Sequence, residues 1–130
     1  MSALPDSHVD LFETTAFGHL ATLLPNGAPH VTPVWIDHDG DTVLVNTATG
    51  RRKERNVRDR PQVGLSVVDP ENPYRWLSLW GGVERVRTEG AVEHIHELSL
   101  RYTGERYDLG GDEGERVVLQ IDPEEVLTGG

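Results

Sequence analysis

A cluster of basic residues follows one predicted strand and begins a predicted helix. Six of the ten residues 51–60 are basic and two are acidic, so this segment carries +4 in a chain whose net charge is −10. A strand that leads through Gly50 into a helix presents free backbone N–H groups and the positive end of the helix dipole to an anion. The segment predicts a phosphate site. A solvated helix stabilised by pairs such as Glu54 and Arg58 is the alternative interpretation.

Other patterns that could carry chemistry are weaker. The chain has no cysteine, which excludes thiolate nucleophiles and disulfides. Glu93 and His96 have the spacing of two metal ligands on a helix, but the sequence offers no third, so no metal site is predicted. No serine lies in a nucleophile elbow. The glycine-rich segment 110–114 is acidic where a phosphate loop needs basic residues. No catalytic side chain can therefore be named.

Composition limits the class of protein. A chain of 130 residues suits a single domain, residues 1–130, and a pI near 4.9 argues against general nucleic-acid binding. No apolar run reaches the 18 residues that a membrane helix needs, and the first residues do not resemble a signal peptide. We therefore expect no membrane or nucleic-acid partner and a cytoplasmic location.

The order of the elements predicts a mainly β (α+β) fold. Short helices are expected at about residues 8–16 and at 51–60, and a helical period runs from Thr88 to a C-terminal cap at Gly104. The turn at Pro25-Asn26-Gly27 predicts a hairpin, and residues 37–41 and 69–74 are expected as a turn and a loop. We predict a six-stranded antiparallel barrel, because most strands are joined by short turns rather than by helices. The predicted strands are 18–24, 29–36, 42–47, 62–68, 76–87 and 116–122.

The three tryptophans all lie on predicted strands. Aromatic residues on strands usually belong to the core. Trp80 precedes the pair Gly81-Gly82, which suggests a bend or the close approach of another backbone. Trp80, and less readily Trp35 and Trp76, could instead line a flat heteroaromatic ring.

Five stretches together resemble a known family. They are residues 18–27, 29–35, 46–59, 69–75 and 82–86. As a set they resemble the pyridoxamine 5′-phosphate oxidase-like family of FMN-binding split β-barrels. Within it they are similar to the flavin/deazaflavin oxidoreductases that use coenzyme F420. The resemblance covers about residues 10–122. It implies a homodimeric split barrel with two cofactor sites at the subunit interface.

The resemblance also implies roles for individual residues. Arg51, Lys53 and Arg55 would bind the cofactor phosphate and its anionic tail, and Arg52 and Asn56 belong to the same basic motif. Asn46 and Thr47 would bond ring or ribityl oxygens. The tricyclic ring would be bordered, largely through backbone, by Val31, Thr32, Pro33, Val34 and Trp35. The segment from Asn72 through Tyr74 to Arg75, together with Trp80, would close the site. In one arrangement, the partner subunit would supply these residues.

The activity implied is hydride transfer from reduced F420 to a small organic acceptor. The cofactor would supply the chemistry, which agrees with the lack of a nucleophile or metal constellation. FMN as cofactor in the same barrel, or a non-catalytic flavin- or deazaflavin-binding protein, are the alternatives. F420 continues beyond its phosphate into a polyglutamate tail, so a long basic track favours it over FMN. We do not expect pyridoxamine phosphate oxidation, since the basic and aromatic C-terminal segment of those oxidases is missing from this sequence.

Overall fold

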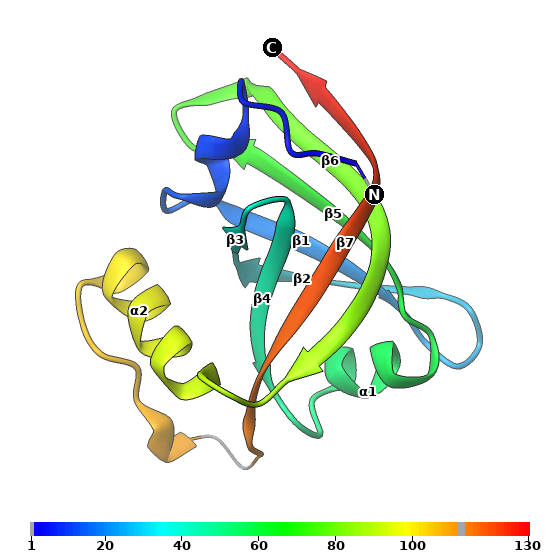
Figure 1. The fold of residues 1–130 in the computed structure, drawn as a ribbon, viewed down its shortest axis with the longest axis vertical. Helices are drawn as coiled ribbons and strands as arrows, with labels where there is room; N and C mark the ends of the chain where they lie inside the picture. The colour runs from blue at the N-terminus through cyan, green and yellow to red at the C-terminus, as the bar shows by residue number, and fades with distance from the viewer. Residues whose placement is uncertain (1, 112–113) are drawn as a thin grey trace.

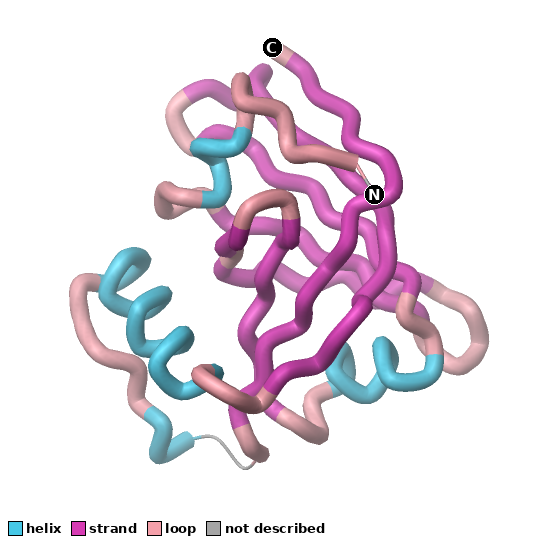
Figure 2. The backbone as a smooth tube through the Cα atoms, viewed as in Figure 1, coloured by secondary structure: helices cyan, strands magenta, loops and turns pink. Residues whose placement is uncertain are grey.

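The computed structural model describes residues 2–111 and 114–130. In this part of the chain, seven strands form one antiparallel sheet in the order β2-β1-β5-β6-β7-β4-β3. The sheet curls, and the helices lie outside it (Figures 1 and 2). The strands are β1 (Phe17–Leu23), β2 (Pro29–Trp35), β3 (Asp37–Asp39), β4 (Thr42–Ala48), β5 (Gln62–Asp69), β6 (Asn72–Arg87) and β7 (Arg116–Gly129). The predicted fold class is confirmed, with seven strands rather than six.

Two α-helices flank the curled sheet, α1 (Arg52–Asp59) and α2 (Ala91–Thr103). Gly104 has φ +82° and donates its N–H to the Leu100 carbonyl, so the predicted C-terminal cap of α2 is confirmed. Two short 3₁₀ helices, η1 (Val9–Phe12) and η2 (Leu109–Gly111), complete the described elements. None of the helices in the described ranges has the length and apolar character needed to span a membrane.

Four sequence predictions differ from the structure by more than one residue. The predicted turn at 37–41 contains β3, which pairs with β4 and leaves only Gly40 and Asp41 to turn. The predicted loop at 69–74 is a tight turn, since Asn72 already pairs with Asp69. The last strand continues to Gly129 instead of ending at residue 122, because its second half pairs with the first half of the long β6. The predicted helix at 8–16 is only the single turn η1.

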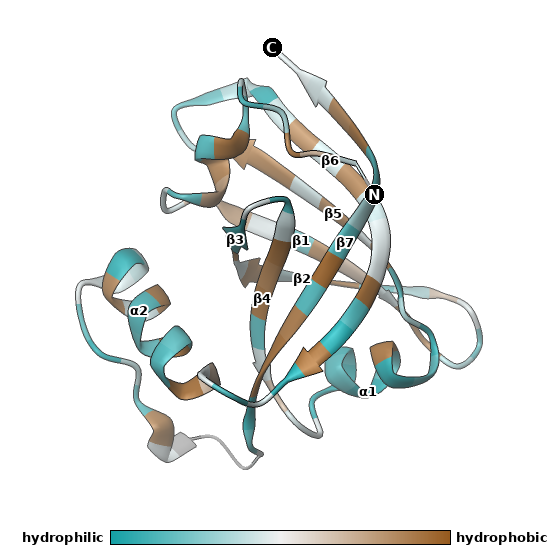
Figure 3. Ribbon diagram, viewed as in Figure 1, coloured by the Kyte–Doolittle hydropathy of each residue, from teal (hydrophilic) through white to brown (hydrophobic). Residues whose placement is uncertain are grey.

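Alternating strand residues fill the interior of the curl. Brown and pale segments alternate along the strands, whereas α1 is mostly hydrophilic (Figure 3). Leu11 and Phe12 of η1 join this core and are almost fully buried. Burying a side chain of this size contributes about 1.5–3 kcal/mol. That burial explains why a single turn of 3₁₀ helix stays docked. The core strand residues include Leu20, Val45, Leu65, Val67, Leu77, Leu79, Leu119 and Ile121.

The glycine pair of β6 lies at an irregularity in its pairing with β7. The register shifts between Trp80 and Gly81, where Gly81 pairs with Pro123. A Cβ on Gly81 would collide with the carbonyl oxygen of Asp122, whereas the nearest atom to a Cβ on Gly82 is 3.9 Å away. The predicted close approach of another backbone is confirmed, and it falls on Gly81.

Replacing these two adjacent glycines tests that close approach. Gly81→Ala should lower the free energy of unfolding by roughly 1–3 kcal/mol, because the neighbouring backbone must move. Gly82→Ala should change it by less than about 1 kcal/mol, since its added methyl group meets no close atom. Urea denaturation of both variants measures the difference. Equal effects would contradict the assignment of the close approach to Gly81.

Candidate functional site

A pocket of about 240 Å³ lies where β2, β4, the start of α1, α2 and the start of β7 meet. Cationic side chains contribute to its lining from β7 and the start of α1, and aromatic and apolar side chains contribute from β1, β2 and α2. The lining residues are Phe17, Pro33, Val34, Trp35, Asn46, Thr47, Arg51, Lys53, Ile95, Tyr107 and Arg116. None of these described residues is acidic. The pocket therefore suits a ligand that has an apolar or aromatic part and an anionic part.

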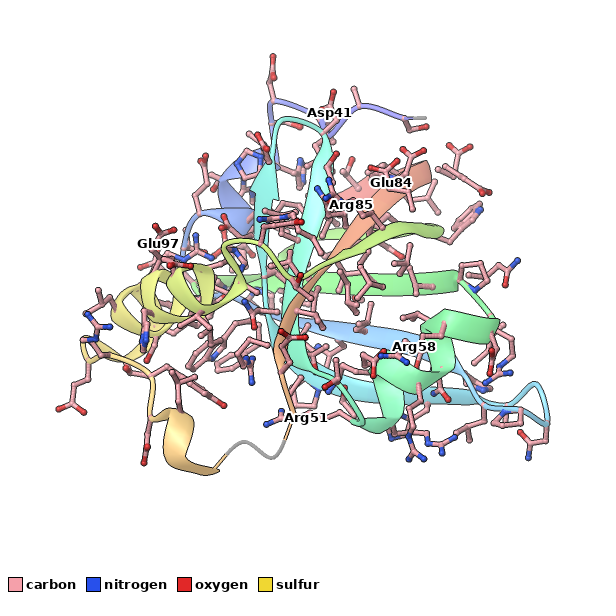
Figure 4. The ribbon with its side chains drawn as sticks, turned by 60° about the horizontal axis from the view of Figure 1, so that its bottom comes forward. Asp41, Arg51, Arg58, Glu84, Arg85 and Glu97 are labelled. Atoms are coloured by element: carbon pink, nitrogen blue, oxygen red, sulfur yellow. The ribbon has the colours of Figure 1, made fainter. Side chains whose placement is uncertain are left out.

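The start of α1 supplies two of the cations. Gly50 adopts φ +89°, which turns the chain out of β4, and Arg51 is the N-cap residue of α1. Glu54 is fully buried; its carboxylate accepts the Gly50 N–H at 2.7 Å and also binds Arg58. This contact resembles a capping box and fixes the turn from which Arg51 and Lys53 extend. Figure 4 shows Arg51 at the end of the sheet where β4 leads into α1.

The third cation comes from the other end of the chain. Arg116 is the first residue of β7 and pairs with Ala48, the last residue of β4. It is only 5% exposed, and its guanidinium lies 5.0 Å from the ring centre of Tyr107. Antiparallel pairing therefore places this side chain next to the turn that carries Arg51.

Electrostatics at this end of the pocket disfavour further positive charge. Burial, and then the charges of Arg51 and Arg116, lower the pKa of Lys53 below its ordinary value of 10.5. A bound anion would reverse the two charge effects.

Thr47 offers a polar group beside these cations. Its hydroxyl is buried and makes no hydrogen bond to any residue in the described part of the chain. A buried hydroxyl without a partner costs about 1–3 kcal/mol. A ligand atom in the adjacent pocket could satisfy it.

Aromatic rings also line and support the pocket. The rings of Trp35 and Tyr102 stack with centroids 5.1 Å apart and an interplanar angle of 13°, and Tyr107 meets Trp35 edge-on at 6.2 Å. Phe17 packs against Tyr102 at 5.5 Å. This packing orients Trp35 at the pocket and gives it a rigid apolar wall.

The sequence matches the pyridoxamine 5′-phosphate oxidase family over residues 4–128. The chain belongs to that family. A solved structure named F420 reductase is 34% identical, covers 95% of this chain and 98% of its own, and has a TM-score of 0.85. The family match and this relative together support an oxidoreductase of the flavin or deazaflavin type.

More distant structures share the fold alone. A conserved hypothetical protein from Mycobacterium tuberculosis is 23% identical, with a TM-score of 0.75 over 97% of this chain and 84% of its own. HupZ from Group A Streptococcus is 20% identical, with a TM-score of 0.71 over 96% of this chain and 93% of its own. No curated protein matches the sequence.

Seven of the residues predicted for the family's cofactor site line the pocket. They are Pro33, Val34, Trp35, Asn46, Thr47, Arg51 and Lys53. The amide of Asn46 is already used, because its Oδ1 accepts from Arg116 and its Nδ2 donates to the Ala91 carbonyl. Its predicted bond to the cofactor therefore competes with protein contacts.

The remaining residues of the basic motif and of β2 lie outside the pocket lining. Arg52 donates to the Asn56 side chain, and the fully buried Asn56 donates to Thr22 at 2.9 Å, so this pair fastens α1 to β1. Arg55 is exposed on α1. Val31 is exposed on β2, while the hydroxyl of Thr32 is buried.

The residues predicted to close the site lie on β6. Arg75 binds Asp10 and Asp69, which fastens η1 to the sheet. Asn72 accepts the Tyr74 N–H, and Tyr74 is exposed. Trp80 is 49% exposed. These four do not line the pocket of their own chain, so their role at a partner's site stays a prediction.

Sequence reasoning did not name four of the lining residues. Phe17 is paired with Trp35 across the β1–β2 hairpin, a register that the Asn26-Gly27 turn could have given. Ile95, Tyr107 and Arg116 reach the pocket only through long-range packing, for which the sequence carries no local signal. The described residues contain no cluster of three or more potential metal ligands of the His, Cys, Asp or Glu type.

Substituting Lys53 separates anion binding from stability. The pKa of Lys53 is lower in the folded than in the unfolded chain. The unfolded chain therefore holds this proton more tightly, and stability rises with pH between the lowered pKa and 10.5. Lys53→Met should then raise the melting temperature at pH 7. It should also weaken pyrophosphate binding by roughly 10- to 150-fold, the equivalent of one charge-assisted hydrogen bond.

Arg85→Met is the matched control, since it removes one positive charge from an exposed side chain distant from Arg51 (Figure 4). It should change pyrophosphate affinity by less than roughly fivefold. In the unsubstituted protein, this affinity should fall as pH rises through the pKa of Lys53. Titration calorimetry and thermal melts measure both effects. Equal affinities for the two variants would exclude Lys53 from the anion site.

Proposed function

We propose that the protein is an F420-dependent oxidoreductase that passes hydride from the reduced cofactor to a small organic acceptor. The observation that carries the proposal is the pocket lining, which combines three cations with aromatic side chains and includes no acidic residue among the described ones. The likeness to a structure named F420 reductase supports the same cofactor. When bound, the deazaflavin supplies the hydride.

The residues present fit such a cofactor. Arg51, Lys53 and Arg116 would hold its phosphate, and the unpartnered Thr47 hydroxyl would bond a polar atom of the ligand. The β2 segment from Pro33 to Trp35 would flank the ring and exclude water from it. The protein thus binds and orients the cofactor and keeps water away from its ring. No described side chain is needed as nucleophile.

A homodimer is part of the proposal, because the pocket borders an exposed apolar sheet face. Strand register places Val31, Ala21, Gly64 and Trp80 in one row across β2, β1, β5 and β6. We call this surface the outer face. Exposed apolar side chains on it include Phe17 (51%), Val31 (56%), Trp80 (49%) and Leu127 (48%).

A second copy of the chain is the occupant that this face suits. Phe17, Pro33 and Trp35 belong both to the outer face and to the pocket lining. A pocket of about 240 Å³ is also smaller than the roughly 300–1,000 Å³ of complete ligand sites. A partner seated on the outer face would extend the pocket walls.

FMN remains the second candidate cofactor, because three cations suffice for a single terminal phosphate. F420 is favoured by the further basic residues along α1, where Arg52 and Arg55 lie beyond the pocket. These would face the anionic tail that FMN lacks.

Cofactor binding and turnover test the proposed activity. The protein should bind F420 more tightly than FMN in fluorescence titrations, and it should accelerate oxidation of reduced F420 by an enone or quinone acceptor. Tighter binding of FMN than of F420 would make FMN the cofactor instead. Tight F420 binding without acceleration by any acceptor in a broad panel would favour a carrier.

A pair of leucine substitutions tests the dimer. Leu127→Glu places a carboxylate in the outer face and should weaken self-association by roughly 100-fold or more, because an unpaired buried charge costs several kcal/mol. Leu100→Glu is the control, since Leu100 is similarly exposed but lies on α2. Light scattering at micromolar concentration should show a monomer for the first variant only. A monomeric parent protein would remove the dimer from the proposal.

A further inference from the structure

A chain of side-chain hydrogen bonds runs from Asp37 to Arg116. Arg116 donates to Asn46 Oδ1 from Nε at 3.0 Å and from Nη2 at 2.7 Å. Asn46 Nδ2 donates to the Ala91 carbonyl at 2.9 Å and lies 3.1 Å from His94 Nδ1. His94 Nε2 lies 3.0 Å from Asp37 Oδ2. The chain connects β3, α2, β4 and β7 and ends at the pocket.

Each donor and acceptor in this chain is fixed by its neighbours. The amide nitrogen of Asn46 has only protons to offer, so His94 Nδ1 must accept one of them. The ring of His94 then carries its proton on Nε2 and donates it to Asp37. Burial alone would raise the pKa of Asp37. Hydrogen bonds from His94 and from the His38 N–H, together with the charge of Arg101, outweigh burial, so the pKa of Asp37 is lowered. A carboxylate is therefore present to accept.

The orientation of the Asn46 amide decides what Arg116 meets. In the orientation observed, Asn46 turns its oxygen to two donors of the guanidinium. A flipped amide would turn its NH₂ group toward Arg116 and its oxygen toward the Ala91 carbonyl, which places donor against donor and acceptor against acceptor. His94 Nδ1 is a second acceptor for the NH₂ group beside the Ala91 carbonyl, and it therefore supports the amide orientation that holds Arg116. The ring of Tyr107 packs against the same guanidinium.

We propose that His94 and Asp37 are positioning residues that hold Arg116 at the cationic end of the pocket through Asn46. The proposal rests on the anion-binding role of Arg116 in the proposed function. A purely structural role is the competing explanation, in which the network only fastens α2 to the sheet. Tyr102 does fasten α2 in that way, since its hydroxyl accepts the Ile36 N–H at 3.1 Å and donates to the Ala16 carbonyl at 2.6 Å.

Tyr102→Phe is therefore the matched control for His94→Leu. Both remove polar anchors of α2, but only His94 connects to Arg116. With inorganic pyrophosphate as probe, His94→Leu should weaken binding roughly 5- to 10-fold, and Tyr102→Phe less than about twofold. In an Arg116→Met background, His94→Leu should have less than about a twofold effect, because the group it positions is gone. An undiminished effect of His94→Leu in that background, or an equal effect of Tyr102→Phe, would overturn the proposal.

A second measurement needs no ligand. The Nε–Hε signal of Arg116 in a ¹⁵N spectrum can be assigned by its loss in Arg116→Met. His94→Leu should accelerate solvent exchange of this proton by roughly tenfold or more, and Tyr102→Phe should leave it unchanged. Asp37→Asn, which keeps the size of the side chain, should act in the same direction and serves if His94→Leu does not fold. Unchanged exchange in the folded variants would overturn the proposal.

The two measurements separate this inference from the proposed function. If the parent protein binds no pyrophosphate but the exchange pattern is as expected, the anion site fails and the positioning of Arg116 stands. If pyrophosphate binds and Arg116→Met weakens it, while neither His94→Leu nor Asp37→Asn alters the Arg116 proton, the anion site stands and the positioning fails.

Discussion

Antiparallel pairing of β4 with β7 brings the two halves of the cationic site together. Ala48 pairs with Arg116, so the strand end that leads to Arg51 and Lys53 adjoins the first residue of β7. Repulsion among three like charges in a partly enclosed space opposes this arrangement. The buried side chains of both strands hold it in place, including Val45 and Leu119, which pair directly. The fold thus holds three cations close together beside the pocket.

The distribution of acidic groups reinforces that point. The chain is strongly acidic overall, yet the carboxylate that follows Lys53, Glu54, binds the Gly50 N–H and Arg58. Asp37 likewise acts on His94 and Arg101. These two carboxylates therefore shape the framework around the pocket. Such conflicts between stability and local charge are typical of functional sites.

Sequence patterns predicted what is local. The Asn26-Gly27 turn, the Gly104 cap, the strand–Gly50–helix motif and the Gly81 approach each depend on a few adjacent residues whose backbone preferences are strong. Features set by distant segments were missed. β3 is too short to show a period, the last part of β7 is a strand because β6 is long enough to pair with it, and Arg116 enters the pocket through the β4–β7 register. No window of sequence contains that information.

One property of the basic turn has a practical consequence in protein chemistry. Lys53 is the only lysine in the chain, and its pKa is lowered. At mildly alkaline pH it is therefore more nucleophilic than an exposed lysine, since more of it is present as the free amine. Amine-directed reagents have a single side-chain target, and only the terminal amine competes with it. A fluorophore or crosslinker placed there would report directly from the mouth of the pocket, and a bound anion would protect the residue from labelling.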